Sequence, residues 1–239
     1  MVWSMIDKKP LIGVNCNFEE RKKAPWVTVP AKYLDAVYEN GGIPVVIPPF
    51  EDEYHLESYF SFLDGFLFVG GDDYDPGLYG GEVLPDMELA HPRRTKHDLL
   101  MMKQVLKQQK PLLAVCAGMQ MMNIAAGGRL IPHLETGMRH TGEYYHQITI
   151  HEGSLLAGIF SETTLIVNSY HHQAVDPAYV GQGLDIIALA PDGIPEAISV
   201  RGRSFQLGVQ WHPERIDNLQ HRNLLFSTFI RAASSPDET

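Results

Sequence analysis

The chain has 239 residues, of which 44% are apolar and 20% charged, and its formal charge at pH 7 is −10. These values are typical of a globular α/β protein, and the acidic balance argues against binding to nucleic acid or to an anionic membrane. The sequence contains no run of about 18 apolar residues, so we expect no membrane-spanning helix. Its two cysteines are too few for a disulfide framework, and we therefore expect a cytoplasmic protein.

Strand and helix patterns alternate through the first half of the chain. Short apolar runs predict strands at residues 11–16, 43–47, 65–69 and 111–115. Amphipathic or capped segments predict helices at residues 30–40, 53–62, 94–109 and 118–126. This alternation predicts a mostly parallel sheet with helices packed on both of its faces.

The second half is richer in strands. Strand patterns occur at residues 147–150, 164–168, 184–190, 196–200 and 205–210, before a closing helix at 218–231. The tail at 232–239 is small and polar, and we expect it to fray. Because no linker or repeat divides the chain, we predict one α/β domain over residues 1–239. Its architecture is expected to be a flavodoxin-like three-layer sandwich, whose mostly parallel central sheet gains antiparallel strands in the C-terminal half.

Cys116 lies where a short buried strand is expected to run into a helix. Its neighbours Ala114, Ala117 and Gly118 are small, which is typical of the sharp turn that presents a nucleophile above a sheet edge. The following helix directs backbone N–H groups at the sulfur, which favours the thiolate and places the Ala117 N–H to bind an oxyanion. The alternative is a buried, inert cysteine, an interpretation that we adopt for Cys16 because no motif supports it.

A base for this nucleophile is expected in Trp-His-Pro-Glu at residues 211–214. Pro213 favours extended backbone at His212, and residues two apart in an extended chain share a face. We therefore expect Glu214 to hold the His212 ring while the ring faces the thiol. The alternative is a loop histidine beside a solvated carboxylate.

The chain resembles the class I glutamine amidotransferase-like superfamily in Ala-Val-Cys-Ala-Gly-Met-Gln at 114–120 and in Trp-His-Pro-Glu. Four further segments are similar to those of its γ-glutamyl-γ-aminobutyrate hydrolase branch, the peptidase C26 family: residues 27–33, 41–45, 69–76 and 168–175. The resemblance covers nearly the whole chain. It implies that Cys116 is the nucleophile, His212 the base and acid, and Glu214 the third member of a triad.

The same resemblance implies the rest of the site. The backbone N–H groups of Gly71 and Ala117 would form the oxyanion hole. The γ-glutamyl group would be held by a set of four residues: Gln120, Tyr170, His172 and Gln173. The chain departs from the superfamily at Ala114, where a glycine is frequent two residues before the nucleophile, and its methyl group is expected to tighten the turn.

Three other groups of residues are expected to have structural roles. His171 and His172 are adjacent and should face opposite sides of an extended segment, and the remaining histidines lack zinc-site spacing, so we expect no metal and no cofactor. The charged start of a helix, Arg93, Arg94 and Lys96, is expected to be solvated. The cluster Met119, Met121 and Met122 is expected to pack in the core.

The expected function is hydrolysis of the γ-glutamyl amide bond of a γ-glutamyl-amine through a thioester, giving glutamate and a free amine. The conjugated amine would be γ-aminobutyrate or a polyamine, the partner a small-molecule substrate, and a homodimer the candidate assembly. Two alternatives stay open: a glutaminase subunit that passes ammonia to a separate synthetase, and a non-catalytic regulatory protein on the same scaffold.

Overall fold

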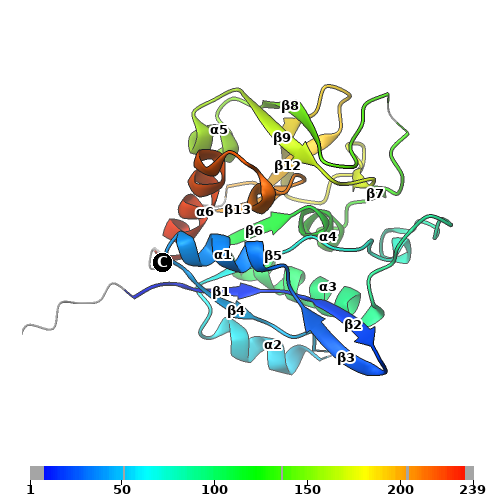
Figure 1. The fold of residues 1–239 in the computed structure, drawn as a ribbon, viewed down its shortest axis with the longest axis vertical. Helices are drawn as coiled ribbons and strands as arrows, with labels where there is room; N and C mark the ends of the chain where they lie inside the picture. The colour runs from blue at the N-terminus through cyan, green and yellow to red at the C-terminus, as the bar shows by residue number, and fades with distance from the viewer. Residues whose placement is uncertain (1–7, 51, 136, 203–204, 235–239) are drawn as a thin grey trace, which may run out of the picture.

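The computed structural model describes residues 8–50, 52–135, 137–202 and 205–234. In this part of the chain the core is a nine-stranded mixed sheet (Figure 1). Its strands, in spatial order, are β4 (Ile43–Val46), β1 (Leu11–Val14), β5 (Gly65–Phe68), β6 (Leu112–Val115), β13 (Gln206–Val209), β12 (Pro195–Val200), β11 (Leu184–Leu189), β8 (Tyr144–Ile150) and β9 (Thr164–Ser169).

The direction of the strands changes halfway across the sheet. From β4 to β13 neighbouring strands pair in parallel, whereas β12, β11, β8 and β9 continue the sheet with antiparallel pairing. The predicted α/β fold, with added antiparallel strands in the C-terminal half, is therefore confirmed.

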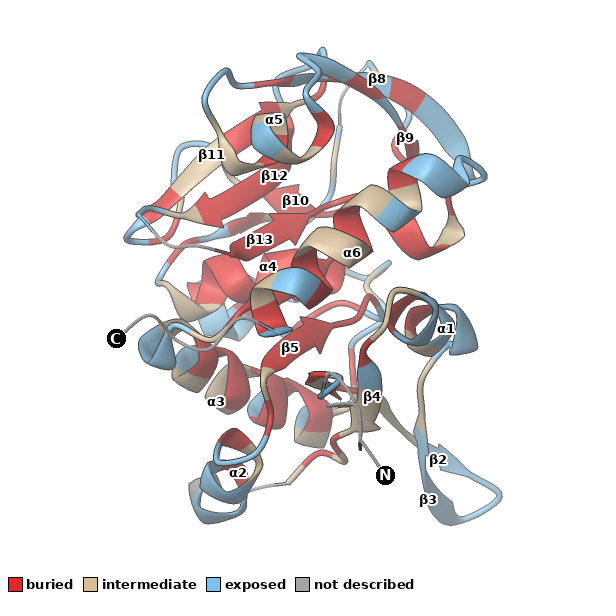
Figure 2. Cartoon of the chain, turned by 90° about the vertical axis from the view of Figure 1, so that its left-hand side faces the viewer, coloured by how far each residue is buried: buried red, intermediate tan, exposed pale blue. Residues whose placement is uncertain are grey.

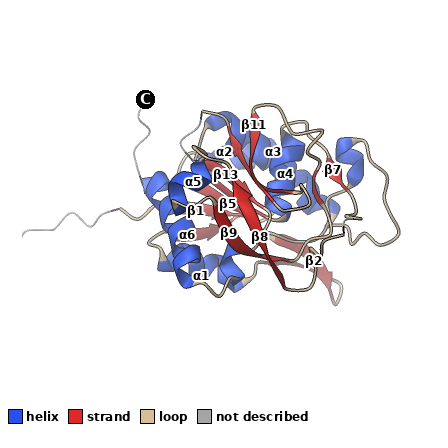
Figure 3. Cartoon of the chain, turned by 90° about the horizontal axis from the view of Figure 1, so that it is seen from above, coloured by secondary structure: helices blue, strands red, loops and turns tan. Residues whose placement is uncertain are grey.

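Helices cover both faces of the sheet, which makes three layers (Figure 3). One face carries α1 (Ala31–Glu39), α5 (Leu155–Phe160) and α6 (Leu219–Ser234), and the other carries α2 (Glu53–Phe60), α3 (Pro92–Gln108) and α4 (Ala117–Ala125). Side chains of one strand alternate between these layers, as in β5, where Leu67 packs on one side and Phe66 and Phe68 on the other. Strand β5 is buried along its whole length (Figure 2), which explains its continuous apolar sequence.

Several elements were not predicted. They are the hairpin β2 (Asn17–Arg21) and β3 (Ala24–Thr28), the short pair β7 (Leu130–Ile131) and β10 (Ala174–Val175), helix α5, and the 3₁₀ turns η1 (Pro76–Tyr79) and η2 (Pro213–Arg215). The hairpin extends away from the sheet and is largely exposed (Figures 1 and 2), so it lacks the apolar alternation that marks a half-buried strand.

The end of the chain also differs from the prediction. Helix α6 continues to Ser234, so the expected fraying of residues 232–234 is wrong, and residues 235–239 lie outside the described part. Ala233 is buried in the same apolar cluster as Ile12, which keeps this last turn helical. Among the described residues, no helix is long and apolar enough to cross a membrane.

The carboxyl ends of the parallel strands meet at one edge of the sheet. The register pairs Ala114 with Phe68 on one side, and Val115 with Val209 on the other. As a result, the segments that follow β5, β6 and β13 leave the sheet side by side. Ligand sites of open α/β sheets lie at such an edge.

Candidate active site

Cys116 occupies the sharp turn between β6 and α4. Its backbone has φ 52° and ψ −110°, a conformation that costs free energy for a residue other than glycine. Hydrogen bonds from the Cys116 N–H to the Val209 carbonyl (2.8 Å) and from the Gln120 N–H to the Cys116 carbonyl (3.1 Å) hold the turn in place. Gly118 is needed here because a Cβ atom would lie 2.6 Å from the Phe68 carbonyl oxygen. The turn thus has the geometry expected of a nucleophile elbow.

His212 follows β13 at the same sheet edge and is clamped through its backbone. Asn168 accepts from the His212 N–H (2.8 Å) and donates to the His212 carbonyl (2.9 Å). The Nδ1 atom lies 2.7 Å from Oε1 of Glu214, so the two side chains meet as expected. The expected reason was wrong, however. Pro213–Arg215 forms a 3₁₀ turn rather than extended chain, and this turn brings the Glu214 carboxylate to the ring.

The surroundings of His212 favour its charged form. Burial alone would lower the pKa of this imidazole, but charge attraction and hydrogen bonding with Cys116, followed by those with Glu214, raise it to about 9. An imidazolium at neutral pH is the partner that a cysteine thiolate requires.

The loop after β5 carries Gly70 and Gly71 to the edge beside Cys116. Beneath it lies the guanidinium of Arg94, which donates to the carbonyls of Val69 (3.4 Å) and Gly70 (3.2 Å). A Cβ atom on residue 71 would collide with this guanidinium, so glycine is the residue that fits. The expectation that Arg94 is solvated was wrong: its side chain is 1% exposed and pairs with the buried Asp98 at 3.1 Å.

The second expected oxyanion donor is the N–H of Ala117. It belongs to the first residue of α4, where backbone N–H groups have no acceptor within the helix. Gly71 and Cys116 both line one cavity of about 220 Å³. The structure therefore brings the nucleophile, the base and both expected oxyanion donors to one place.

The four expected substrate-binding residues all line this cavity. Gln120 donates to the Gln173 carbonyl (3.1 Å), and the Gln173 side chain is buried without a hydrogen-bond partner among the described residues. The Tyr170 ring packs edge-on to His212, with centroids 5.4 Å apart, and its hydroxyl donates to Glu143 (3.1 Å). Gln173 thus offers free amide groups, whereas Tyr170 shapes the wall beside the base.

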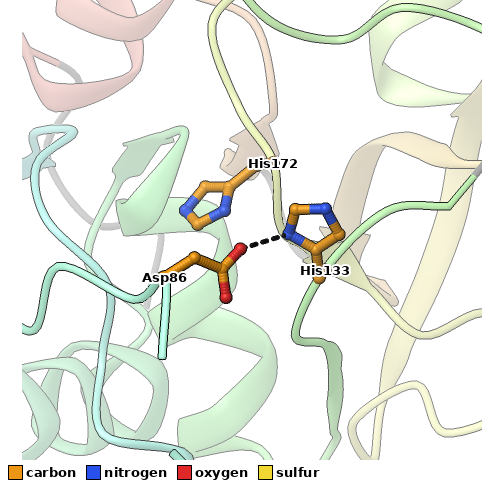
Figure 4. Close-up of side chains that lie close together, drawn as sticks. All are labelled: Asp86, His133 and His172. Carbon is orange, nitrogen blue, oxygen red and sulfur yellow. Dashed lines mark ion pairs between the residues drawn. The ribbon is translucent and has the colours of Figure 1, made fainter. Parts of the chain in front are cut away.

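The opposite wall of the cavity is acidic. It is formed by Asp72, Asp73, Asp86 and Glu88. His172 bonds to Asp73 at 2.9 Å, which raises the pKa of that imidazole. At the mouth, His172 and His133 flank Asp86, and His133 Nδ1 lies 2.9 Å from the Asp86 carboxylate (Figure 4). This wall is suited to a positively charged group.

Three residues of the site were missed by sequence reasoning. The Tyr33 hydroxyl accepts from the Gly70 N–H (3.0 Å) and lies 3.2 Å from His212 Nδ1. Gln210 donates to the Cys116 sulfur (3.5 Å), and Asn168 holds the His212 backbone. Tyr33 and Asn168 lie in segments that supported the family resemblance, which was the signal for them.

Residues expected to have no part in the chemistry lie away from the cavity. Cys16 is 1% exposed and donates to the Ile47 carbonyl (3.4 Å), and burial raises the pKa of its thiol to about 11. Met119, Met121 and Met122 are buried in the core, as predicted.

Known proteins resemble the whole chain. A family model described as Peptidase C26 matches residues 10–214. A Mycobacterium tuberculosis protein, named provisionally as a glutamine amidotransferase, is 33% identical over 240 residues, which are 95% of this chain and 75% of that protein. The γ-glutamyl-γ-aminobutyrate hydrolase PuuD of Escherichia coli K12 is 32% identical over 244 residues, 95% of this chain and 94% of that protein. The glutaminase domain of Trypanosoma brucei CTPS shares the fold, with a TM-score of 0.70 and 16% identity over 96% of each chain.

Proposed function

The chain belongs to the peptidase C26 family, and from this membership we propose that it is a cysteine-dependent hydrolase of γ-glutamyl amides. The observation that carries the proposal is the strained Cys116 turn, which lines a cavity and interacts with His212 of a buried His212–Glu214 pair. A structural cysteine would not require this backbone strain, a buried charged base and a cavity at the same point.

The first half of the reaction forms a thioester. The Cys116 thiolate attacks the γ-carbonyl carbon, and the carbonyl oxygen becomes an oxyanion that accepts from the N–H groups of Gly71 and Ala117. His212 donates its proton to the leaving nitrogen as the C–N bond breaks, and the free amine departs. Glu214 keeps the His212 ring oriented and stabilises its charge.

The second half releases glutamate. The neutral His212 ring takes a proton from water, and the resulting hydroxide attacks the thioester carbon. The same two N–H groups hold the second oxyanion, after which the C–S bond breaks and Cys116 returns to the thiolate. The atoms of one amide and one water thus become one glutamate and one amine, with no further reactant.

The acidic wall favours a leaving amine that carries a further positive charge, such as a polyamine, over γ-aminobutyrate, which carries a carboxylate. Asp72, Asp86 and Glu88 line the cavity that holds Cys116. Burial raises the pKa of the Asp72 carboxyl. The charge of Arg94 lowers this pKa, whereas the nearby carboxylates Glu88 and Asp73 raise it further. An ammonium group would relieve this crowding, whereas a second carboxylate would add to it. We therefore place γ-glutamyl-polyamines ahead of γ-glutamyl-γ-aminobutyrate.

A matched substrate pair tests this choice. Glu88→Gln should raise the KM for γ-glutamyl-putrescine about two- to fivefold, which is the effect of losing one partly exposed ion pair. The KM for γ-glutamyl-γ-aminobutyrate should stay unchanged or fall. A preference of the unmodified protein for the γ-aminobutyrate conjugate, unaltered in Glu88→Gln, would exclude the cationic amine.

The amidotransferase alternative has support from the relative in M. tuberculosis and from the fold shared with a glutaminase domain. The two functions differ in whether glutamate release needs a second protein. A free-standing hydrolase releases glutamate from γ-glutamyl-amines with no other protein present. Release from glutamine alone, and only after a synthetase is added, would establish the alternative.

A further inference from the structure

Four buried side chains meet at the wall of the substrate cavity, and we call them the His–Glu cluster. They come from the loop before β8, from β8, from the segment after β9 and from β12: His140, His146, His171 and Glu196. We propose that the His–Glu cluster binds a zinc ion. Neither the family membership nor the proposed reaction requires this site.

The inner atoms of the cluster are in ion-pair contact but form no hydrogen bonds among the described residues. The Oε1 atom of Glu196 lies 3.4 Å from Nε2 of His146, 3.4 Å from Nε2 of His171 and 3.7 Å from Nδ1 of His140. Nitrogen-to-oxygen hydrogen bonds are about 2.7–3.2 Å long. Within the described part of the chain, none of these nitrogens has a hydrogen-bond partner, and neither does either Glu196 oxygen. A fully buried carboxylate that accepts no hydrogen bond is costly, which indicates that the cluster lacks a component.

The same distances suit ligands around one ion. Zinc binds imidazole nitrogen and carboxylate oxygen at about 2.0–2.2 Å, and two ligands of a tetrahedral ion are then about 3.4 Å apart. Ligand atoms of His140, His146 and Glu196 all lie within 4.8 Å of one another. His171 lies outside this set, although its Nε2 atom approaches the same Glu196 oxygen to 3.4 Å, and it is the candidate for a fourth ligand. Two imidazoles and a carboxylate are three of the four ligands that zinc takes, and a third imidazole beside them would close the site as in structural zinc centres.

The outer nitrogens of the three rings are already engaged. His140 Nε2 lies 2.9 Å from the Asp192 carboxylate. His146 Nδ1 and His171 Nδ1 lie 3.3 Å and 3.0 Å from backbone carbonyls. Because a carbonyl or carboxylate accepts only from N–H, each outer nitrogen carries a proton, and the inner nitrogens face Glu196. In the neutral form of the rings, the inner nitrogens present lone pairs to Glu196, an arrangement that a bound cation would stabilise and that is typical of metal ligands.

The exposed group at the cavity mouth provides a contrast. Asp86, His133 and His172 are also close enough to share an ion (Figure 4). Their polar atoms are already paired, however, His172 with Asp73 and His133 with Asp86, and the His133 and Asp86 side chains are 43% and 54% exposed. This group therefore needs no metal, and it serves as the control.

An ion in the cluster would hold one wall of the substrate cavity. His171 lines the cavity together with its neighbours Tyr170 and His172. The His140 carbonyl accepts from the Ser169 hydroxyl (2.8 Å) and from the His171 N–H (2.9 Å), so the loop and the wall are already joined. Zinc would fix this wall to β8 and β12, and its loss would loosen substrate binding.

The test measures metal content and needs no substrate. Protein dialysed against ZnCl₂ and then against metal-free buffer should keep one zinc per chain by mass spectrometry. His146→Gln and Glu196→Gln should lose it, whereas His133→Gln and Cys116→Ala should keep it. Removal of zinc by a chelator should lower the Tm of the unmodified protein. Zinc content in the unmodified protein no higher than in His146→Gln would overturn the proposal.

A second measurement applies if those variants do not fold. X-ray absorption of the zinc-loaded, unmodified protein should show a shell of nitrogen and oxygen with imidazole scattering. A sulfur ligand would place the ion at Cys116 instead and would equally overturn the proposal. Both experiments detect the metal and not glutamate release, so their outcomes do not depend on whether the proposed hydrolase activity is correct.

Discussion

Replacement of Glu214 by glutamine should move the alkaline limb of the pH–activity profile. In the unmodified protein, activity depends on a protonated His212, whose pKa is raised to about 9 by Cys116 and then Glu214. The kcat/KM should therefore fall as the pH rises through about 9, because the imidazolium is lost. Glu214→Gln keeps the shape of the side chain but removes its charge from the 2.7 Å contact with Nδ1.

The size of the shift follows from this contact. A hydrogen bond to a charged group contributes about 1.5–3 kcal/mol, and one pKa unit corresponds to about 1.36 kcal/mol. Without the Glu214 charge, the pKa of His212 should fall by about one to two units, and the alkaline limb should move to about pH 7–8. The kcat should also decrease roughly 10³–10⁴-fold, the size of effect seen for the carboxylate of Ser-His-Asp triads.

The assay is glutamate release from a γ-glutamyl-amine across a pH series. Glu39→Gln is the matched control, because it removes the same charge from an exposed position on α1. An alkaline limb that does not move in Glu214→Gln, or that moves equally in Glu39→Gln, would refute the coupling of His212 to Glu214.

Three other perturbations have defined outcomes. Because folding raises the pKa of His212 to about 9, the stabilisation by this residue is present below about pH 6.5 and is lost as the pH rises through about 9. Over this pH range the Tm of His212→Gln should therefore fall less than the Tm of the unmodified protein. Gly71→Ala should reduce kcat about 10²–10³-fold through displacement of an oxyanion donor, whereas Gly158→Ala, where a Cβ meets nothing within 4 Å, should leave kcat unchanged. Arg94→Met should lower the free energy of unfolding by about 3–5 kcal/mol in urea titrations, since it removes the guanidinium from the buried Asp98 carboxylate, and a loss below about 1 kcal/mol would contradict the assigned ion pair.

The parallel half of the fold could be predicted because its signals are local. Buried strands such as β5 and β6 have continuous apolar sequences, and the helices between them have capping or amphipathic patterns. The Cys116 turn was also predictable, since small residues after a buried strand mark it within a single segment. Helix α5 has only six residues and a Ser154 cap, too short a pattern to distinguish from a loop.

The parts that could not be predicted depend on contacts between distant segments. Arg94 is in a charged sequence typical of a solvated helix start, and only the fold places it beneath the Gly70 carbonyl. The sequence likewise argued against a metal, because His171 and His172 do face different surroundings. What it could not show is that His171 meets Glu196, which lies on another strand.

The proposed hydrolysis requires a covalent γ-glutamyl thioester on Cys116. The most direct measurement is the mass of the protein after brief incubation with a γ-glutamyl-amine and an acid quench. We predict the mass gain of one glutamyl group, located on the peptide that contains Cys116 and absent from Cys116→Ala, which should fold normally but release no glutamate. Steady glutamate release by Cys116→Ala at the rate of the unmodified protein would exclude a covalent intermediate on Cys116.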